Sequence, residues 1–558
     1  MCLNHQSFTK QFFEVSSRVP MKISRLHQLF FSTLFLIGSI LSLSFGVFRA
    51  PARAAFGQWV FTPSPQSCYF LSQGQTEFSF DLQADGAWQG IQRTKQTSSL
   101  SAPEKIFSGT SMADLRAFLL ESPCGLSTLA GEMTLELKGR VQAGQTFQLV
   151  LPSNPSTGYL WEVEGGVANT TITREQIQMR QMIPRIGGMA AQSISLRALR
   201  STIATISLRY HRPWETESSA GIVYRVQAEQ VWLSDLAQSL SLHVPSTAMD
   251  SANPVDGFPK VSTPIPEQIA AAQELPTAFN WCSLGKCTPV RNQGNCGSCW
   301  AFSTVGVLES KLLIADNNSQ DLSEQYLVSC NTNNWGCDGG WFAHDYHIWK
   351  IPPSESQAGA VLESSFRYQA ADLPCNGPYS HPYRALSWHY ISTYDSIPSP
   401  AAIKQAIYTY GPVAAAVCAG SAFEYYRGGV FATDEKTVCG SSLVNHGIVL
   451  VGWDDSQGVW ILRNSWGPYW GEGGYMRIKY GVSNVGLGAN YLVYNSSPSP
   501  TAPAATTPPP NTPAPTTPPP TTVVPPYPPP TTEPGPYPGP QPSGLINYLP
   551  LILNWFLP

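Results

Sequence analysis

QGNCGSCWAFS, residues 293–303, is the stretch that decides the fold of the C-terminal half of this 558-residue chain. From Cys299 onward the apolar residues recur with helical period, which predicts a helix that begins at this cysteine. The dipole and the free N–H groups at a helix N-terminus favour the thiolate, which is the reactive form of cysteine. A bare C-x-x-C pattern also fits a structural disulfide, a redox pair or half of a zinc site.

Two later stretches supply further polar residues. VNHGIVLVGW (444–453) places His446 at the start of an apolar strand, about 150 residues after Cys299. WILRNSWGPYW (460–470) contains Asn464. A lone histidine is most often structural and a lone asparagine is most often a turn residue, so only their combination with the cysteine indicates catalysis.

Together these stretches resemble the papain family of cysteine peptidases. The C-G-S-C-W run around Cys299 matches the family's signature, and the histidine and then the asparagine follow in the family's order. LSEQYLVSC (322–330) and GCDGG (336–340) match further family motifs. The resemblance covers residues 275–494 and implies an α+β, two-lobed catalytic domain.

The resemblance also implies a role for each polar residue. Cys299 would be the nucleophile, and His446 would take and return the proton. Asn464 would orient the imidazole, and Trp466 would shield that hydrogen bond from water. The Gln293 side chain and the Cys299 backbone N–H would form an oxyanion hole. The implied reaction on polypeptide substrates is acyl transfer through a thioester followed by hydrolysis, with no cofactor and no metal.

Substrate binding is inferred from the same family pattern. Gly339 and Gly340 would form a backbone platform for an extended peptide, because glycine allows close approach. Phe342, Ala416 and Asn490 would line the S2 pocket, where we expect an apolar or aromatic side chain. Nothing in the sequence resembles the inserted loop of the family's exopeptidases, so we expect an endopeptidase.

The cysteines fit the same scheme. Of the twelve in the chain, Cys2 falls in the expected export signal, and the odd number that remains leaves one thiol unpaired. By family the pairs are Cys296–Cys337 and Cys330–Cys375, to which we add Cys282–Cys287, Cys418–Cys439 and Cys68–Cys124. The cysteine left over is Cys299.

Three stretches farther upstream lie between strand-like runs. They are Asn154-Pro155-Ser156-Thr157-Gly158-Tyr159, Arg185-Ile186-Gly187-Gly188 and Arg212-Pro213-Trp214. In this order they resemble the three inhibitory loops of the chagasin family of cysteine-peptidase inhibitors, which is an all-β, immunoglobulin-like sandwich. The resemblance spans residues 129–236. Arg185 departs from the family pattern, which has glycine there, and is expected to affect fit or selectivity.

The two resemblances together predict a regulated enzyme. No long helical pro-segment is evident in residues 55–275, so the chagasin-like domain is expected to close the cleft of its own chain or of a foreign papain-like peptidase. One alternative is that the sandwich is only a spacer. Another is that the chain is chiefly an inhibitor or surface-binding protein, with the catalytic domain secondary.

Composition sets the remaining boundaries. The net charge of −4, with both signs mixed, gives no argument for a nucleic-acid partner. Residues 1–54, with Met21 as an alternative start of the chain, predict a cleaved export signal and a secreted or cell-surface protein, with an uncleaved membrane anchor as the alternative. The predicted segments are then a small β-rich region of unknown role (55–127), the chagasin-like domain (128–245), a linker (246–275), the catalytic domain (276–495), a disordered Pro/Thr-rich stalk (496–543) and a short apolar tail (544–558). The sequence leaves open whether this tail associates with a cell surface.

Overall fold

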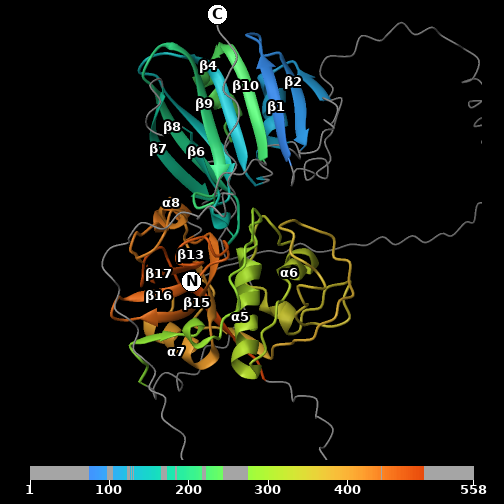
Figure 1. Cartoon of the computed structure of the whole chain (residues 1–558), viewed down its shortest axis with the longest axis vertical. Helices are drawn as coiled ribbons and strands as arrows, with labels where there is room; N and C mark the ends of the chain where they lie inside the picture. Colours follow the sequence, from blue (N-terminus) through green and yellow to red (C-terminus); the bar gives the residue numbers. More distant parts are fainter. Residues whose placement is uncertain are drawn as a thin grey trace, which may run out of the picture. The chain divides into compact units, whose positions relative to one another are not determined.

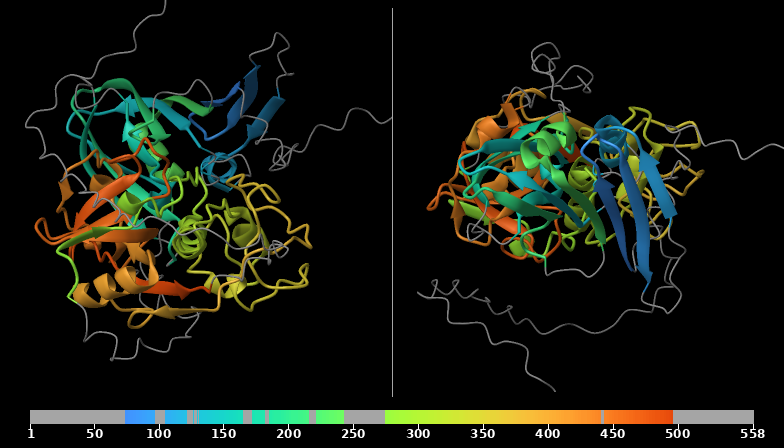
Figure 2. Two further views of the ribbon diagram at one scale, coloured as in Figure 1. Left: turned by 60° about the horizontal axis from the view of Figure 1, so that its bottom comes forward. Right: turned by 90° about the horizontal axis from the view of Figure 1, so that it is seen from above.

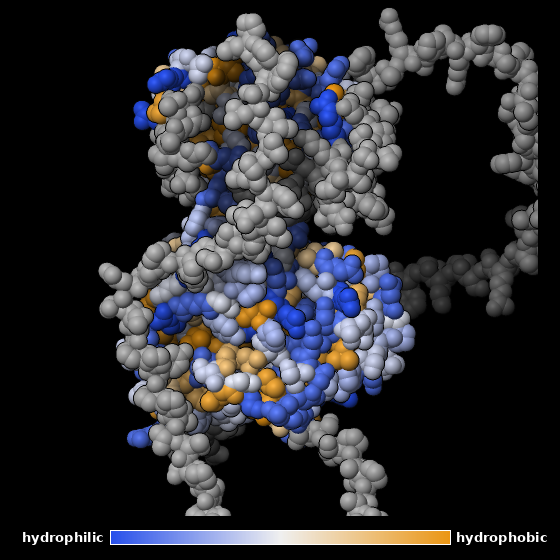
Figure 3. All heavy atoms as spheres, viewed as in Figure 1, coloured by the Kyte–Doolittle hydropathy of each residue, from blue (hydrophilic) through white to orange (hydrophobic). Residues whose placement is uncertain are grey.

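The computed structural model describes residues 74–96, 105–121, 126, 129, 131–164, 172–181, 185–215, 221–242, 274–440 and 443–495. The expected export signal, stalk and tail, nearly all of the expected linker, and Cys68 and Cys124 lie outside these residues. Among the described helices, none is long and apolar enough to cross a membrane. On the face shown in Figure 3, the apolar residues of the described parts occur in groups among hydrophilic ones.

Residues 74–242, here called the β domain, contain a seven-stranded sheet with the order β3-β2-β1-β10-β4-β9-β6. β10 runs parallel to both β1 and β4, and the other neighbours are antiparallel. The strands are β1 (Gly74–Leu82), β2 (Trp88–Gln96), β3 (Lys105–Gly109), β4 (Met133–Val141), β6 (Leu160–Val163), β9 (Thr202–His211) and β10 (Gly221–Trp232).

A second, three-stranded sheet packs on the first. Its order is β5-β8-β7, and its strands are β5 (Thr146–Ser153), β7 (Ile172–Gln181) and β8 (Ala190–Ala198). Leu149 of β5 and Ile194 of β8 share one buried core with Leu135 of β4 and Leu208 of β9. Buried positions alternate with more exposed ones along β4 and along the first half of β5, so each of these strands presents one face to this core. The helices α3 (Met112–Glu121) and α4 (Leu233–Leu240) also contribute to the core.

The strands that precede residue 127 belong to this same sheet. β1 pairs with β10 over the register Gln75↔Gly221 to Asp81↔Gln227. Phe78 of β1 stacks on Tyr224 of β10 with ring centroids 5.4 Å apart. The boundary expected at residue 127 therefore does not separate two cores. Parallel pairing of distant segments leaves no turn signal between them, so the sequence offered no sign of this association.

Residues 274–495, here called the C-terminal domain, combine helices with one sheet. The sheet has the order β12-β18-β13-β15-β16-β17-β14, and β11 pairs with β15. Its strands are β11 (Ala278–Asn280), β12 (Ser387–Tyr390), β13 (Val413–Val417), β14 (Val430–Phe431), β15 (His446–Asp454), β16 (Val459–Arg463), β17 (Tyr475–Lys479) and β18 (Leu487–Val493). The helices are α5 (Cys299–Asp316), α6 (Glu324–Cys330), α7 (Pro400–Tyr410), α8 (Ser421–Glu424) and α9 (Lys436–Cys439), with short 3-10 turns at Cys282–Leu284 and His344–His347.

The helix α5 lies between two groups of elements. Figure 1 shows α6 on one side of α5 and strands β13, β15, β16 and β17 on the other, and the views in Figure 2 keep this separation. The first three turns of α5 are buried on every side, from Cys299 to Ser310. A helix packed from both sides is apolar all round rather than amphipathic. This packing fixes the N-terminus of α5 against the sheet.

Four disulfides cross-link the C-terminal domain. The pairs are Cys282–Cys287, Cys296–Cys337, Cys330–Cys375 and Cys418–Cys439, as expected from the sequence. Among the described residues, Cys299 is the free cysteine. Disulfides in this number fit an oxidising compartment.

Candidate active site

Cys299 is the first residue of α5 and is completely buried. Its Sγ takes part in hydrogen bonds with the backbone of Gly447 and with the hydroxyl of Ser156 from the β domain. Because water is excluded, burial raises the pKa of the Cys299 thiol to about 12. The thiolate expected at a helix N-terminus is therefore not the favoured form in this arrangement, since desolvation outweighs the helix dipole.

His446 and Asn464 meet because their strands pair. His446 begins β15, Asn464 follows β16, and the two strands are antiparallel. His446 Nε2 lies 2.7 Å from Asn464 Oδ1. A carboxamide oxygen only accepts, so Nε2 carries the proton and Nδ1 keeps its lone pair. Nδ1 is buried and has no hydrogen-bond partner among the described residues.

The electrostatics of His446 follow from its burial. Removal from water lowers the pKa of the imidazole to about 4, although the hydrogen bond with Asn464 acts in the opposite direction. The imidazole is therefore neutral near pH 7. The imidazole and the thiol are the groups that acyl transfer requires. The form that attacks a carbonyl is the thiolate–imidazolium pair, and both groups are neutral in this arrangement.

Gln293 is held through both its side chain and its backbone. Its Nε2 donates to the Cys296 carbonyl at 2.9 Å, and its Oε1 accepts from Ser465 Oγ at 2.7 Å. Its backbone N–H donates to the Ser465 carbonyl at 2.8 Å. The carboxamide carries a second N–H donor, which is what an oxyanion hole requires.

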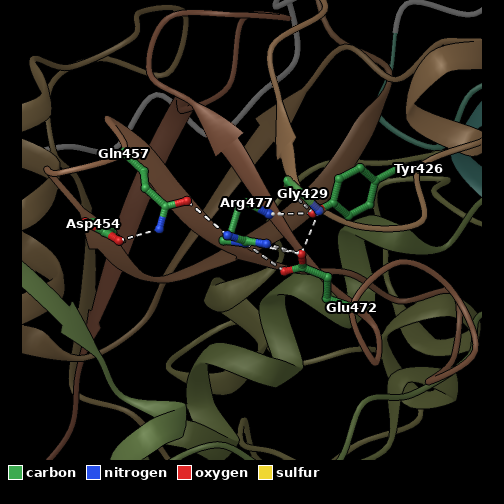
Figure 4. Close-up of polar contacts among 6 residues, drawn as sticks. All are labelled: Tyr426, Gly429, Asp454, Gln457, Glu472 and Arg477. Carbon is green, nitrogen blue, oxygen red and sulfur yellow. Dashed lines mark hydrogen bonds and ion pairs between the residues drawn. The ribbon is translucent and has the colours of Figure 1, made fainter. Parts of the chain in front are cut away.

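Trp466 covers the imidazole. Its ring centroid is 4.9 Å from that of His446, and the indole is buried. The loop after Trp466 is braced through Glu472, which accepts from Arg477 Nη2 at 2.6 Å and from the Gly429 N–H at 2.9 Å (Figure 4). Arg477 Nη1 donates in turn to Gln457 at 2.9 Å. This network ties the loop to β17.

The residues expected to bind substrate lie on one side of Cys299. Phe342 and Ala416 are fully buried in the same apolar cluster as Cys299 and as Ile186 of the β domain. Asn490 is also buried, but both ends of its carboxamide are engaged, because Oδ1 pairs with His344 Nε2 at 2.9 Å and Nδ2 donates to Gly488. The Gly340 backbone pairs with Ile186 in an isolated antiparallel bridge.

The first predicted loop, residues 154–159, lies at the thiol. Asn154 caps a 3-10 turn, Pro155–Thr157, which Gly158 ends with φ +78°. A Cβ on Gly158 would come within 2.2 Å of the Trp214 ring, so this position requires glycine. The Ser156 carbonyl accepts from Trp466 Nε1 at 2.7 Å.

The second loop, residues 185–188, lies along Gly339 and Gly340. Gly340 N donates to the Ile186 carbonyl at 3.0 Å, and Gly187 N donates to the Asn445 carbonyl at 2.8 Å. Arg185 Nη1 donates to the Asn334 carbonyl at 3.3 Å.

The third loop, residues 212–214, is held to the C-terminal domain by hydrogen bonds. Arg212 is 1% exposed. It donates to the Thr157 carbonyl, Asn292 Oδ1 and the Gly294 carbonyl, each at 2.8 Å. Arg427 Nη2 donates to the Pro213 carbonyl at 2.8 Å.

The structure thus brings the residues expected for a catalytic site into contact with the residues expected for inhibitory loops. Sequence reasoning missed Ile186, Asn292 and Ser156 as contact residues. An apolar residue between Arg185 and Gly187 was the one available signal for Ile186. Ser156 lies within the loop motif of residues 154–159, but the motif does not show which of its residues reaches the thiol. Asn292 carries no pattern, because its partner Arg212 lies in a different domain.

A buried thiol at a helix N-terminus, next to a paired imidazole and carboxamide, places the protein among the cysteine peptidases. A family model described as papain family cysteine protease matches residues 275–495, and one described as chagasin family peptidase inhibitor I42 matches residues 140–227. The chain is 34% identical to zingipain-2 of Zingiber officinale over 38% of this chain and 90% of that protein. The chain belongs to the papain family of cysteine proteases.

Other relatives cover the same region. The senescence-specific cysteine protease SAG12 of Arabidopsis thaliana is 34% identical over 41% of this chain and 65% of its own length. The chain spans 62–65% of the length of this and several similar relatives. A solved structure of the Carica candamarcensis cysteine protease CMS1MS2 in complex with E-64 is 30% identical, covers 40% of this chain and 100% of that one, and has a TM-score of 0.33.

Proposed function

We propose that this protein is a secreted cysteine endopeptidase whose cleft is closed in cis by its own chagasin-like domain. The observation that carries the proposal is the complete burial of Cys299 and His446 beneath residues of the same chain, with Ser156 at the thiol. The papain-type two-lobed and immunoglobulin-like descriptions of the two domains are part of this proposal. The four disulfides support an exported protein.

The chemistry would begin when the β domain leaves. With water readmitted, His446 Nδ1 takes the Cys299 proton, and the thiolate attacks a peptide carbonyl. Gln293 Nε2 and the Cys299 N–H donate to the oxyanion. The imidazolium then protonates the leaving amine, and water hydrolyses the thioester. Asn464 keeps the imidazole in the tautomer that the first step needs.

Closure within one chain is favoured by the covalent link between the domains. A flexible linker holds an inhibitory surface at an effective concentration of the order of millimolar, so that moderate affinity keeps the cleft closed. Cleavage within residues 246–275 would release it.

The test is a peptidase assay on the full-length chain. We expect low activity in the wild type and Cys299-dependent activity when the interface is weakened by Trp214→Ala. Because closure in cis is unimolecular, the specific activity of the wild type should not change over a hundredfold dilution. A rise on dilution would indicate closure between molecules. Absence of hydrolysis in Trp214→Ala, with the Cys299→Ala combination as control, would contradict the peptidase assignment.

A further inference from the structure

The segment 185–188 crosses the cleft in the way a peptide would. Ile186 pairs with Gly340 through its carbonyl, and Gly187 donates to the carbonyl of Asn445, the residue before His446. A Cβ on Gly187 would lie within 1.9 Å of the Gly297 carbonyl, two residues before Cys299. The peptide bond between Gly187 and Gly188 therefore lies between the residues that flank the thiol and the imidazole.

That peptide unit is held at both ends. Its carbonyl, the Gly187 oxygen, accepts from Asn154 Nδ2 at 2.8 Å. Its N–H, on Gly188, donates to the Arg185 carbonyl at 3.0 Å and closes a turn. The plane of the peptide is therefore fixed, and with it the direction of the carbonyl.

The Asn154 carboxamide is itself oriented. Its Oδ1 accepts from the Ser156 backbone N–H at 3.2 Å and from Ser156 Oγ at 2.6 Å. Its backbone N–H donates to Tyr210 OH at 3.1 Å, and the residue is 2% exposed. With Oδ1 committed to Ser156, Nδ2 is the end that faces Gly187. One side chain thus links the first inhibitory loop to the second.

We propose that Asn154 is a positioning residue that protects the β domain from hydrolysis by its own C-terminal domain. This inference rests on the proposed function. Catalysis requires the carbonyl oxygen to reach the oxyanion donors, Gln293 Nε2 and the Cys299 N–H. A Gly187 carbonyl that accepts from Asn154 is withheld from them, so the loop occupies the cleft and is not cut.

Loss of the Asn154 donor would convert the loop into a substrate. The Cys299 thiolate would attack the Gly187 carbonyl carbon, and the Gly187–Gly188 C–N bond would break with His446 protonating the leaving amine. Water would then hydrolyse the thioester, which leaves a Gly187 carboxylate and restores the thiol. No other reactant is needed.

The test uses full-length Asn154→Asp, which keeps the acceptor and removes the donor, and Asn154→Ala, which removes both. Intact mass should show a cut between Gly187 and Gly188 at a rate about a hundredfold above wild type, the size of the effect of one oxyanion-hole donor. Combination with Cys299→Ala should abolish the cut. Trp214→Ala, which loosens the interface and keeps the Asn154 bond, should gain peptidase activity without this cut.

Two outcomes separate failure of this inference from failure of the proposed function. Asn154 variants that hydrolyse a peptide substrate but are never cut at Gly187–Gly188 would overturn the protective role and leave the peptidase intact. Trp214→Ala without Cys299-dependent activity would overturn the proposed function itself. Thermal unfolding of each variant identifies general misfolding, which would give cuts at many sites.

Discussion

Trp214 of the β domain stacks on Trp466 of the C-terminal domain, with ring centroids 5.3 Å apart and planes 11° from parallel. Trp466 in turn covers the His446 imidazole. The β domain is therefore one ring away from the proposed general base, and release of this contact should change the properties of the candidate site.

Trp214→Ala should raise the activity of the full-length protein. Trp214 is partly buried, and truncation of an interface tryptophan typically costs about 2 kcal/mol or more, which is about a thirtyfold shift toward the open form. The measurement is the initial rate on an extended peptide. Tyr469→Ala is the matched control, because Tyr469 lies on the loop that follows Trp466 and is 84% exposed. An equal rise in both variants would contradict a specific role for the stack.

Arg212→Ala should open the cleft as well. Its guanidinium donates to four acceptors while buried, one of which is the Glu215 carboxylate, and truncation of such a group costs about 2–5 kcal/mol. Arg212→Lys keeps the charge but loses the planar fork, so its activity should fall between those of wild type and Arg212→Ala. Identical behaviour of Lys and wild type would show that charge alone holds this loop.

Asn464→Ala, made in the Trp214→Ala background, should lower kcat with little change in KM. The Nε2–Oδ1 hydrogen bond fixes the imidazole, and loss of alignment in an active site costs about a hundredfold in rate. Steady-state kinetics measure kcat and KM separately. A change confined to KM would place Asn464 in substrate binding instead.

The pKa of His446 should depend on closure. Burial lowers it to about 4 in the closed form, from an ordinary value of 6.5. The closed form thus binds fewer protons, so this group favours closure above pH 6.5 and opposes it increasingly as the pH falls from 6.5 to about 4. Titration of the His446 ring resonances by NMR should give a value near 4 in the full-length wild type and a higher value in Trp214→Ala. Equal values would show that the loops do not cause the shift.

Glu424 should make the protein less stable as the pH rises. Both carboxyl oxygens are buried without a hydrogen-bond partner among the described residues, and burial, together with the nearby Glu435 and Glu162, raises the pKa well above 4.5. The folded protein thus holds this proton more tightly than the unfolded chain, so the stability it contributes is complete below pH 4.5 and declines above it.

Glu424→Gln should therefore unfold at a higher temperature than wild type at pH 7–8. The difference should disappear below about pH 4.5, where wild-type Glu424 is protonated. Calorimetry across this range measures it, with Glu274→Gln on the surface as the control. A pH-independent difference would mean that packing rather than charge sets the effect.

The sequence by itself determined the family of the C-terminal domain and predicted the residues of the candidate site. The stretch QGNCGSCWAFS and the stretches that contain His446 and Asn464 are informative because each has a local conformation, such as a helix start or a strand start. The residue pattern predicts that conformation directly. The loop motifs 154–159 and 212–214 were readable for the same reason, since Pro and Gly restrict the backbone locally.

Only the tertiary structure decided which of these segments contact one another. Three contacts join segments whose association no sequence pattern predicts. They are the parallel pairing of β1 with β10, the hydrogen bonds of Arg212 to Asn292 and Gly294, and the hydrogen bond from Asn154 to Gly187. Burial is likewise a property of the assembled fold. Cys299, which a helix N-terminus would favour as a thiolate, is completely buried in the assembled fold with Ser156 of the β domain at its Sγ, and this burial raises the pKa of its thiol.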